Sequence, residues 1–133
     1  MITRGFRHRC GGLVALGLLL ASCAAKGTVP MPADFPSHTS APPVEIHFRL
    51  TTRSDAVRAD GLVERKSHIG SAWLQLLGLD ATGTIVSFTT PTRVHWRSAS
   101  DLESFAIQLR PRGREERYEV RLYSFEYPEE NTP

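Results

Sequence analysis

Short runs in which apolar and polar residues alternate with a period of two fill the chain from residue 44 to residue 127. The clearest run, 44–50 (VEIHFRL), places four apolar residues on one side of an extended chain and three polar residues on the other. Such alternation is typical of a β-strand with one buried face, because successive side chains of a strand point to opposite sides. The runs are short and rich in β-branched and aromatic residues, which disfavours helices.

Six further runs predict six more strands, at 59–66, 71–79, 84–89, 93–97, 103–110 and 117–127. Turn sequences separate them, notably DATG at 80–83 and RPRG at 110–113. The run 71–79 is apolar on both faces, so we expect it in the centre of a sheet. Seven short strands in about 85 residues indicate an all-β fold, a single antiparallel two-sheet sandwich of immunoglobulin-like type. A small open barrel is the alternative.

The N-terminus carries three arginines within its first twelve residues, followed by the apolar run 13–21 and the sequence Leu20-Ala21-Ser22-Cys23. A basic start, a short apolar run and small residues at its exit are typical of a secretory signal peptide. The run is shorter than the roughly 20 residues of a membrane-spanning helix. The four-residue motif resembles the lipobox of bacterial lipoprotein precursors.

That resemblance implies cleavage between Ser22 and Cys23 and attachment of a lipid to the Cys23 sulfur, which would hold the protein on a membrane. The alternative is an ordinary secreted protein cut near Ala21 or Ala25. Residue Ala24 follows the cysteine where an aspartate would favour the inner membrane, so the resemblance points to the cell envelope, facing the periplasm, with the outer membrane preferred.

Removal of residues 1–22 changes the charge balance of the chain. It removes three of the 16 basic residues, which leaves 13 basic against 14 acidic residues in the mature protein. The basic character of the precursor therefore belongs to the signal peptide, and nucleic acid is not an expected partner. Cys10 leaves with the signal and Cys23 carries the lipid, so no cysteine remains for a disulfide or a thiolate metal site.

The composition divides the chain into four parts. Residues 1–22 form the signal peptide, and 23–43 are predicted to be a lipidated, flexible tether because 24–43 hold five prolines and no apolar periodicity. Residues 44–127 form the sandwich domain. The last six residues, 128–133, are expected to be a disordered tail.

Within the domain, the runs 76–86 (LLGLDATGTIV), 105–109 (FAIQL) and 118–122 (YEVRL) are similar to bacterial FxLyD-like domains. That family has an aliphatic strand, an Asp-x-x-Gly turn and a later strand that begins with Phe. The resemblance covers most of 61–127, implies an envelope sandwich domain, and implies no enzymatic residues.

Candidate catalytic chemistry is sparse in the mature chain. Its four histidines, His38, His47, His68 and His95, lack the spacing of a zinc site. Ser67, His68 and Ser71 are close in sequence but lie in no nucleophile elbow. We therefore expect neither an enzyme nor a cofactor nor a bound metal.

Two groups of residues are candidates for a partner surface. Arg93, His95 and Arg97 form a basic stripe, and strict alternation in the last strand places Tyr123, Phe125 and Tyr127 on one face. An aromatic face of this kind is either covered by the fold or available to a protein, peptide or glycan. The sequence thus predicts a non-catalytic, lipid-anchored binding or scaffold module for an envelope protein, and alternatively a carrier of a small apolar molecule or glycan.

Overall fold

The computed structural model describes residues 29–66, 70–96 and 99–128. The predicted signal peptide, the cleavage pair Ser22 and Cys23, and Arg97 lie outside the described residues. The compact unit begins at Met31. The described residues of this unit form one short 3-10 helix, Pro32–Asp34, and eight strands: β1 (Ser37–Ala41), β2 (Val44–Arg53), β3 (Ala56–Arg65), β4 (Ser71–Leu79), β5 (Ile85–Phe88), β6 (Thr92–His95), β7 (Leu102–Leu109) and β8 (Arg117–Glu126).

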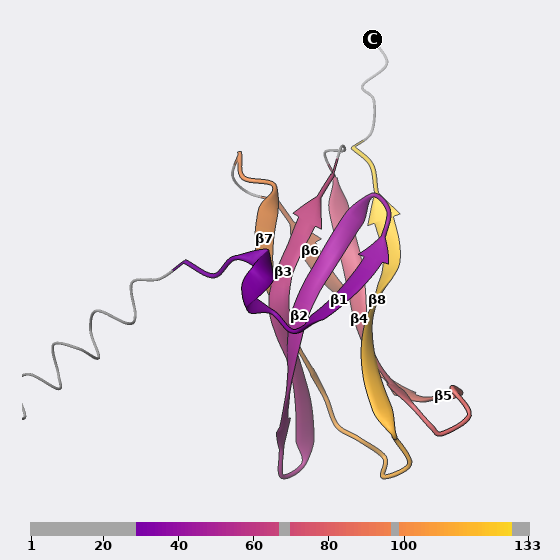
Figure 1. Ribbon diagram of the computed structural model, residues 1–133. Coiled ribbons are helices and arrows are strands. Elements are labelled where there is room, and N and C mark those ends of the chain that lie inside the picture. Colours follow the sequence, from indigo (N-terminus) through magenta and orange to yellow (C-terminus); the bar gives the residue numbers. More distant parts are fainter. Residues whose placement is uncertain (1–28, 67–69, 97–98, 129–133) are drawn as a thin grey trace, which may run out of the picture. The chain divides into compact units, whose positions relative to one another are not determined.

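The strands form two antiparallel sheets that face each other as a β-sandwich (Figure 1). Sheet A has the order β1-β2-β3-β7. In sheet B, β8 pairs with β4 along its whole length, so β5 and β6 share the other edge of β4. The predicted all-β, two-sheet sandwich is confirmed, and so is the central position of 71–79, which is β4.

Sheet A is built around the long β2–β3 hairpin, in which ten residue pairs run from Val44↔Arg65 to Arg53↔Ala56. The apolar side of the predicted strand 44–50 faces the core, where Val44 and Ile46 are completely buried. The β3 residues Val63 and Ala59, which pair with Ile46 and Leu50, are completely buried as well. Alternation therefore predicted both the strand and its buried face.

The core lies between the two sheets and is filled by side chains from six strands and the residue after β6. Its buried members are Val44, Ile46, Phe48, Val57, Ala59, Val63, Ala72, Leu74, Leu76, Val94, Trp96, Phe105, Ile107, Leu109 and Val120. Trp96 also joins separate parts of the chain, because its indole Nε1 donates to the carbonyl oxygens of Val63 (3.3 Å) and Asp101 (3.1 Å).

The predicted domain boundary at residue 44 is wrong, because the sheet begins seven residues earlier. Residues 37–41, placed in the tether by their composition, form strand β1 and pair with β2 from Ser37↔Phe48 to Ala41↔Val44. Thr39 Oγ1 also donates to the carbonyl oxygen of Val120 in β8, at 3.0 Å, and so joins the two sheets. An edge strand gains backbone hydrogen bonds without an apolar pattern, which is why composition did not indicate it.

No helix among the described residues is long and apolar enough to cross a membrane.

In the middle of sheet A, the backbone of β2 comes so close to position 61 that it leaves no space for a side chain. Gly61 pairs with Phe48, and a Cβ atom on it would lie 1.8 Å from the carbonyl oxygen of His47. We expect Gly61→Ala to lower the free energy of unfolding by about 1–3 kcal/mol, as overpacking does. The measurement is chemical denaturation.

The matched control is Ser104→Ala, at an exposed position of β7, which should change the stability by less than about 0.5 kcal/mol. The alanine side chain by itself favours a strand over glycine. A Gly61→Ala variant that is as stable as the parent would therefore contradict the close approach.

Candidate functional site

The predicted aromatic surface does not form as expected, because β8 contains a β-bulge. Trp73 pairs with Ser124 and its neighbour Leu74 pairs with Leu122, so Tyr123 is the extra residue. The bulge reverses the alternation, and Phe125, opposite Ala72, packs against the core. The prediction that Phe125 shares an outer face with Tyr123 is therefore wrong.

Tyr123 is 56% exposed at the bulge, and Tyr127 is also exposed, after the end of β8. The Phe125 ring instead lies 6.3 Å from the ring of Trp96 and 5.0 Å from that of Tyr127, measured between centroids. The sequence held a signal for this reversal. Strict alternation would have turned the polar Ser124 and Glu126 toward the core beside Leu122.

The basic stripe lies on the outer face of sheet B, where Arg93 and His95 of β6 oppose Trp73 and Ser71 of β4. Arg93 Nε donates to Ser71 Oγ at 3.2 Å, and the same hydroxyl lies 3.0 Å from His95 Nδ1. Ser71 is only 4% exposed, and among the described residues no carboxylate forms an ion pair with His95 that would orient it as a base. The Ser71–His95 pair therefore lacks an accessible nucleophile and an orienting acid.

A second network on this face was not predicted. Arg121 of β8 donates from Nε and Nη2 to Gln75 Oε1, at 3.0 and 2.7 Å, and Gln75 Nε2 donates to the carbonyl oxygen of Thr89 at 2.8 Å. Gln75 is 4% exposed, so both ends of a buried amide are satisfied. These arginines are thus engaged with sheet B itself.

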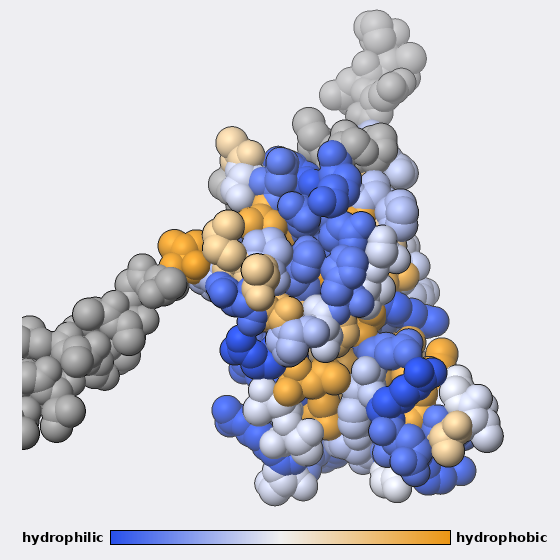
Figure 2. All heavy atoms as spheres, viewed as in Figure 1, coloured by the Kyte–Doolittle hydropathy of each residue, from blue (hydrophilic) through white to orange (hydrophobic). Residues whose placement is uncertain are grey.

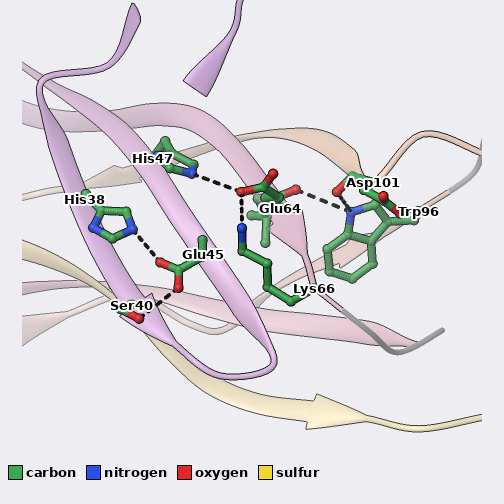
Figure 3. Close-up of polar contacts among 9 residues, drawn as sticks. His38, Ser40, Glu45, His47, Glu64, Lys66, Trp96 and Asp101 are labelled. Carbon is green, nitrogen blue, oxygen red and sulfur yellow. Dashed lines mark hydrogen bonds and ion pairs between the residues drawn. The ribbon is translucent and has the colours of Figure 1, made fainter. Parts of the chain in front are cut away.

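The outer face of sheet A carries a polar cluster across β1, β2 and β3 (Figure 3). His38 and Ser40 of β1 bind the carboxylate of Glu45 in β2, with Ser40 Oγ donating at 2.9 Å. Hydrophilic side chains cover this part of the surface (Figure 2). Hydrogen bonds from Ser40 and then His38 lower the pKa of Glu45 below its ordinary value. The cluster attaches β1 to the sheet.

In the part of this cluster around β3, positively charged or ionisable side chains offset the repulsion between two glutamates. Glu64 lies directly opposite Glu45, and like charges at such positions repel. Lys66 Nζ contacts Glu64 Oε1 at 2.9 Å, which raises the pKa of Lys66, and His47 Nε2 lies 3.7 Å from the same oxygen. Within the described ranges, no group of three or more His, Cys, Asp or Glu side chains is arranged to hold a metal ion.

A groove of about 610 Å³ opens between the two sheets at the edge where β5 and β7 lie. Residues 86–90 and Thr92 line it from sheet B, and residues 106–110 and Arg112 line it from the side of β7. Four consecutive β7 residues reach the groove although their side chains alternate between the faces of the sheet. The groove therefore meets the edge of β7 rather than one of its faces.

Phe88 is the most exposed aromatic side chain of the described residues, at 67%. It belongs to β5, whose hairpin with β4 projects from the rest of sheet B at the lower right of Figure 1. Phe88 was not part of any predicted site. The sequence did show it as the one aromatic residue of the predicted strand 84–89, which ends before Pro91. An exposed aromatic ring beside a groove is a typical anchor for a partner.

The β7–β8 loop places two arginines at one end of this groove. The carboxylate of Glu115 accepts hydrogen bonds from the backbone amides of Arg112 (2.7 Å) and Gly113 (2.9 Å). Gly113 has a φ of +100°, a conformation that favours glycine. The amide of Arg112 is the largest cause that lowers the pKa of Glu115 from 4.5 to about 2. Glu115 thus fixes the loop that carries Arg110 and Arg112.

Comparisons of the chain with known protein families, curated proteins and solved structures found no match. The resemblances to lipoprotein precursors and to FxLyD-like domains therefore rest on the sequence patterns alone.

The role of Glu115 predicts a pH-dependent effect on stability. Because its pKa is lowered in the folded protein, its contribution is complete above its ordinary pKa of 4.5 and is lost as the pH falls toward 2. We expect Glu115→Gln to melt at a lower temperature than the parent at pH 7, with the two melting temperatures converging between pH 4.5 and pH 2. Thermal melts followed by circular dichroism measure this.

Glu116→Gln is the control, because Glu116 contacts the described part of the chain through its backbone amide, which donates to the carbonyl oxygen of Leu79. A constant difference between Glu115→Gln and the parent at every pH would refute the assigned role of the carboxylate.

Proposed function

We propose that this protein is a lipid-anchored module of a bacterial cell envelope that binds a partner protein and catalyses no reaction. The lipobox-like sequence ending at Cys23 supports the anchor, and the slight excess of acidic over basic residues after residue 22 argues against nucleic acid. The anchor would leave the sandwich facing the periplasm. The resemblance to lipoprotein precursors favours the outer membrane.

The main support for the binding role is the groove beside the exposed Phe88. Pockets that bind ligands usually have volumes of about 300–1,000 Å³, and this groove falls within that range. Arg93, His95 and Tyr123, the predicted partner residues that lie on or beside the outer face of sheet B, are less suited. The polar groups of Arg93 and His95 are already engaged with Ser71.

The alternative role as a carrier of a small apolar molecule has less support. Such a carrier needs an open apolar interior, whereas the centre of this sandwich is occupied by large buried side chains, including Ile46, Leu74 and Leu76. The groove at the edge is lined by serine, threonine and arginine residues as well as apolar residues. A protein segment fits such a mixed lining better than an apolar molecule does.

Site-specific photocrosslinking in intact cells tests the binding role. A photoreactive phenylalanine analogue at position 88 should give a discrete protein adduct, because Phe88 lines the groove and its side chain is 67% exposed. The matched control carries the same analogue at Tyr123, which is similarly exposed on another part of the sandwich. The proposal fails if position 88 gives no adduct, or gives the same adducts as position 123.

The anchor is tested separately by Cys23→Ala. We expect this variant to lose incorporation of radiolabelled palmitate and to move from the membrane fraction to the soluble fraction, because no other cysteine remains after cleavage. Ser22→Ala keeps a small residue before the cysteine and should leave both properties intact. Continued labelling of Cys23→Ala would disprove lipid attachment at this cysteine.

A further inference from the structure

The strand order leaves one long edge of sheet A without a partner strand among the described residues. β7 pairs with β3 from Leu102 to Leu109, and no described strand pairs with its other edge. The pairings β2-β3-β7 and β4-β8 correspond to A-B-E and C-F of an immunoglobulin-type sandwich. In that arrangement a further strand, D, pairs with the edge that β7 presents here.

The opposite edge of sheet A is different. β1 forms it, is five residues long, and is joined to sheet B by the hydrogen bond from Thr39 to the Val120 carbonyl oxygen. Natural sheets usually shorten, charge or cover their edges, since free backbone groups pair with other chains. β7 is eight residues long and contains no proline. The second half of this strand, residues 106–109, lines the groove.

The walls of the groove suit an extended chain. A strand added to β7 would lie about 4.8 Å from it and would direct alternate side chains toward opposite sides. One set would meet the wall from sheet B, to which Phe88 and the threonines Thr89, Thr90 and Thr92 belong. The backbone would pair with the amides and carbonyls of β7.

The charge of the groove indicates the chemistry of the segment that would bind there. Its lining contains Arg110 and Arg112 and no acidic residue. Neither guanidinium has an ion-pair partner among the residues that the structure describes. Both arginines lie just after the C-terminal end of β7, in the loop fixed by Glu115. Arginine pairs well with carboxylates because its donors are arranged in a rigid fork.

We propose that the free edge of β7 binds an extended segment of the partner protein by strand addition, with Asp or Glu side chains of that segment paired to Arg110 and Arg112. This inference rests on the proposed binding function and names the chemistry of the partner. Main-chain hydrogen bonds would supply most of the affinity, and Phe88 and the two arginines would supply the selectivity.

The test uses the full-length lipidated protein in cells, with the photoreactive analogue at position 88. Three backgrounds are compared: the parent, Arg110→Gln with Arg112→Gln, and Arg53→Gln with Arg114→Gln as a control that removes the same charge outside the groove. Circular dichroism melts of the purified variants establish that each is folded. Mass spectrometry identifies the crosslinked segment.

We expect the groove variant to lose at least about tenfold of the adduct, the effect of losing a charge-assisted hydrogen bond, while the control keeps it. The crosslinked segment should contain Asp or Glu within a few residues of the crosslink. An adduct of unchanged yield in the groove variant overturns the role of the arginines but leaves the binding function standing. A crosslinked segment without acidic residues, or a glycan or lipid in place of a protein, also overturns the inference.

Strand addition is tested on the same segment as a synthetic peptide. N-methylation of its backbone amides, one at a time, should abolish binding to the purified protein at every second position, because only those amides can face β7. Equal tolerance at all positions would overturn strand addition.

Discussion

Strand β4 is the element on which sheet B depends, because β5, β6 and β8 all hydrogen-bond to it. Its inner side chains, Ala72, Leu74 and Leu76, are completely buried against sheet A. Its outer side chains Gln75 and Leu77 are nearly buried too, and Arg121 of β8 donates two hydrogen bonds to Gln75. Because the sequence after residue 23 contains no cysteine, this doubly covered strand and the core beneath it hold the sandwich together without disulfides.

Most strands could be predicted from their patterns of apolar and polar side chains. Strand β1 and the β8 bulge could not, because both depend on the pairing of the backbone. The seven predicted strands correspond to β2–β8, and the two-sided run 71–79 identified the central strand. Strand β1 has no apolar alternation and forms through backbone pairing with β2, so a composition rich in proline around it suggested a tether instead. The β8 bulge shifts the register by one residue, and a shift of one residue moves every later side chain to the other face.

The same distinction applies to the candidate site. The predicted stripe of Arg93 and His95 is real as a feature of the outer face, but contacts with Ser71 engage both residues. Phe125 was misplaced because the bulge was not anticipated. The groove depends on which edges remain unpaired, and a strand order cannot be read from one alternating sequence. Phe88, Arg110 and Arg112 come together only through that order.

Binding at the β7 side of the sandwich should alter amide exchange there. Hydrogen–deuterium exchange of the purified protein, with and without detergent-solubilised envelope extract, measures this. We expect slower exchange in β7 and β5 when the extract is present, with β1 and the polar cluster of sheet A unchanged. Unchanged exchange in β7, or protection confined to β1, would contradict it.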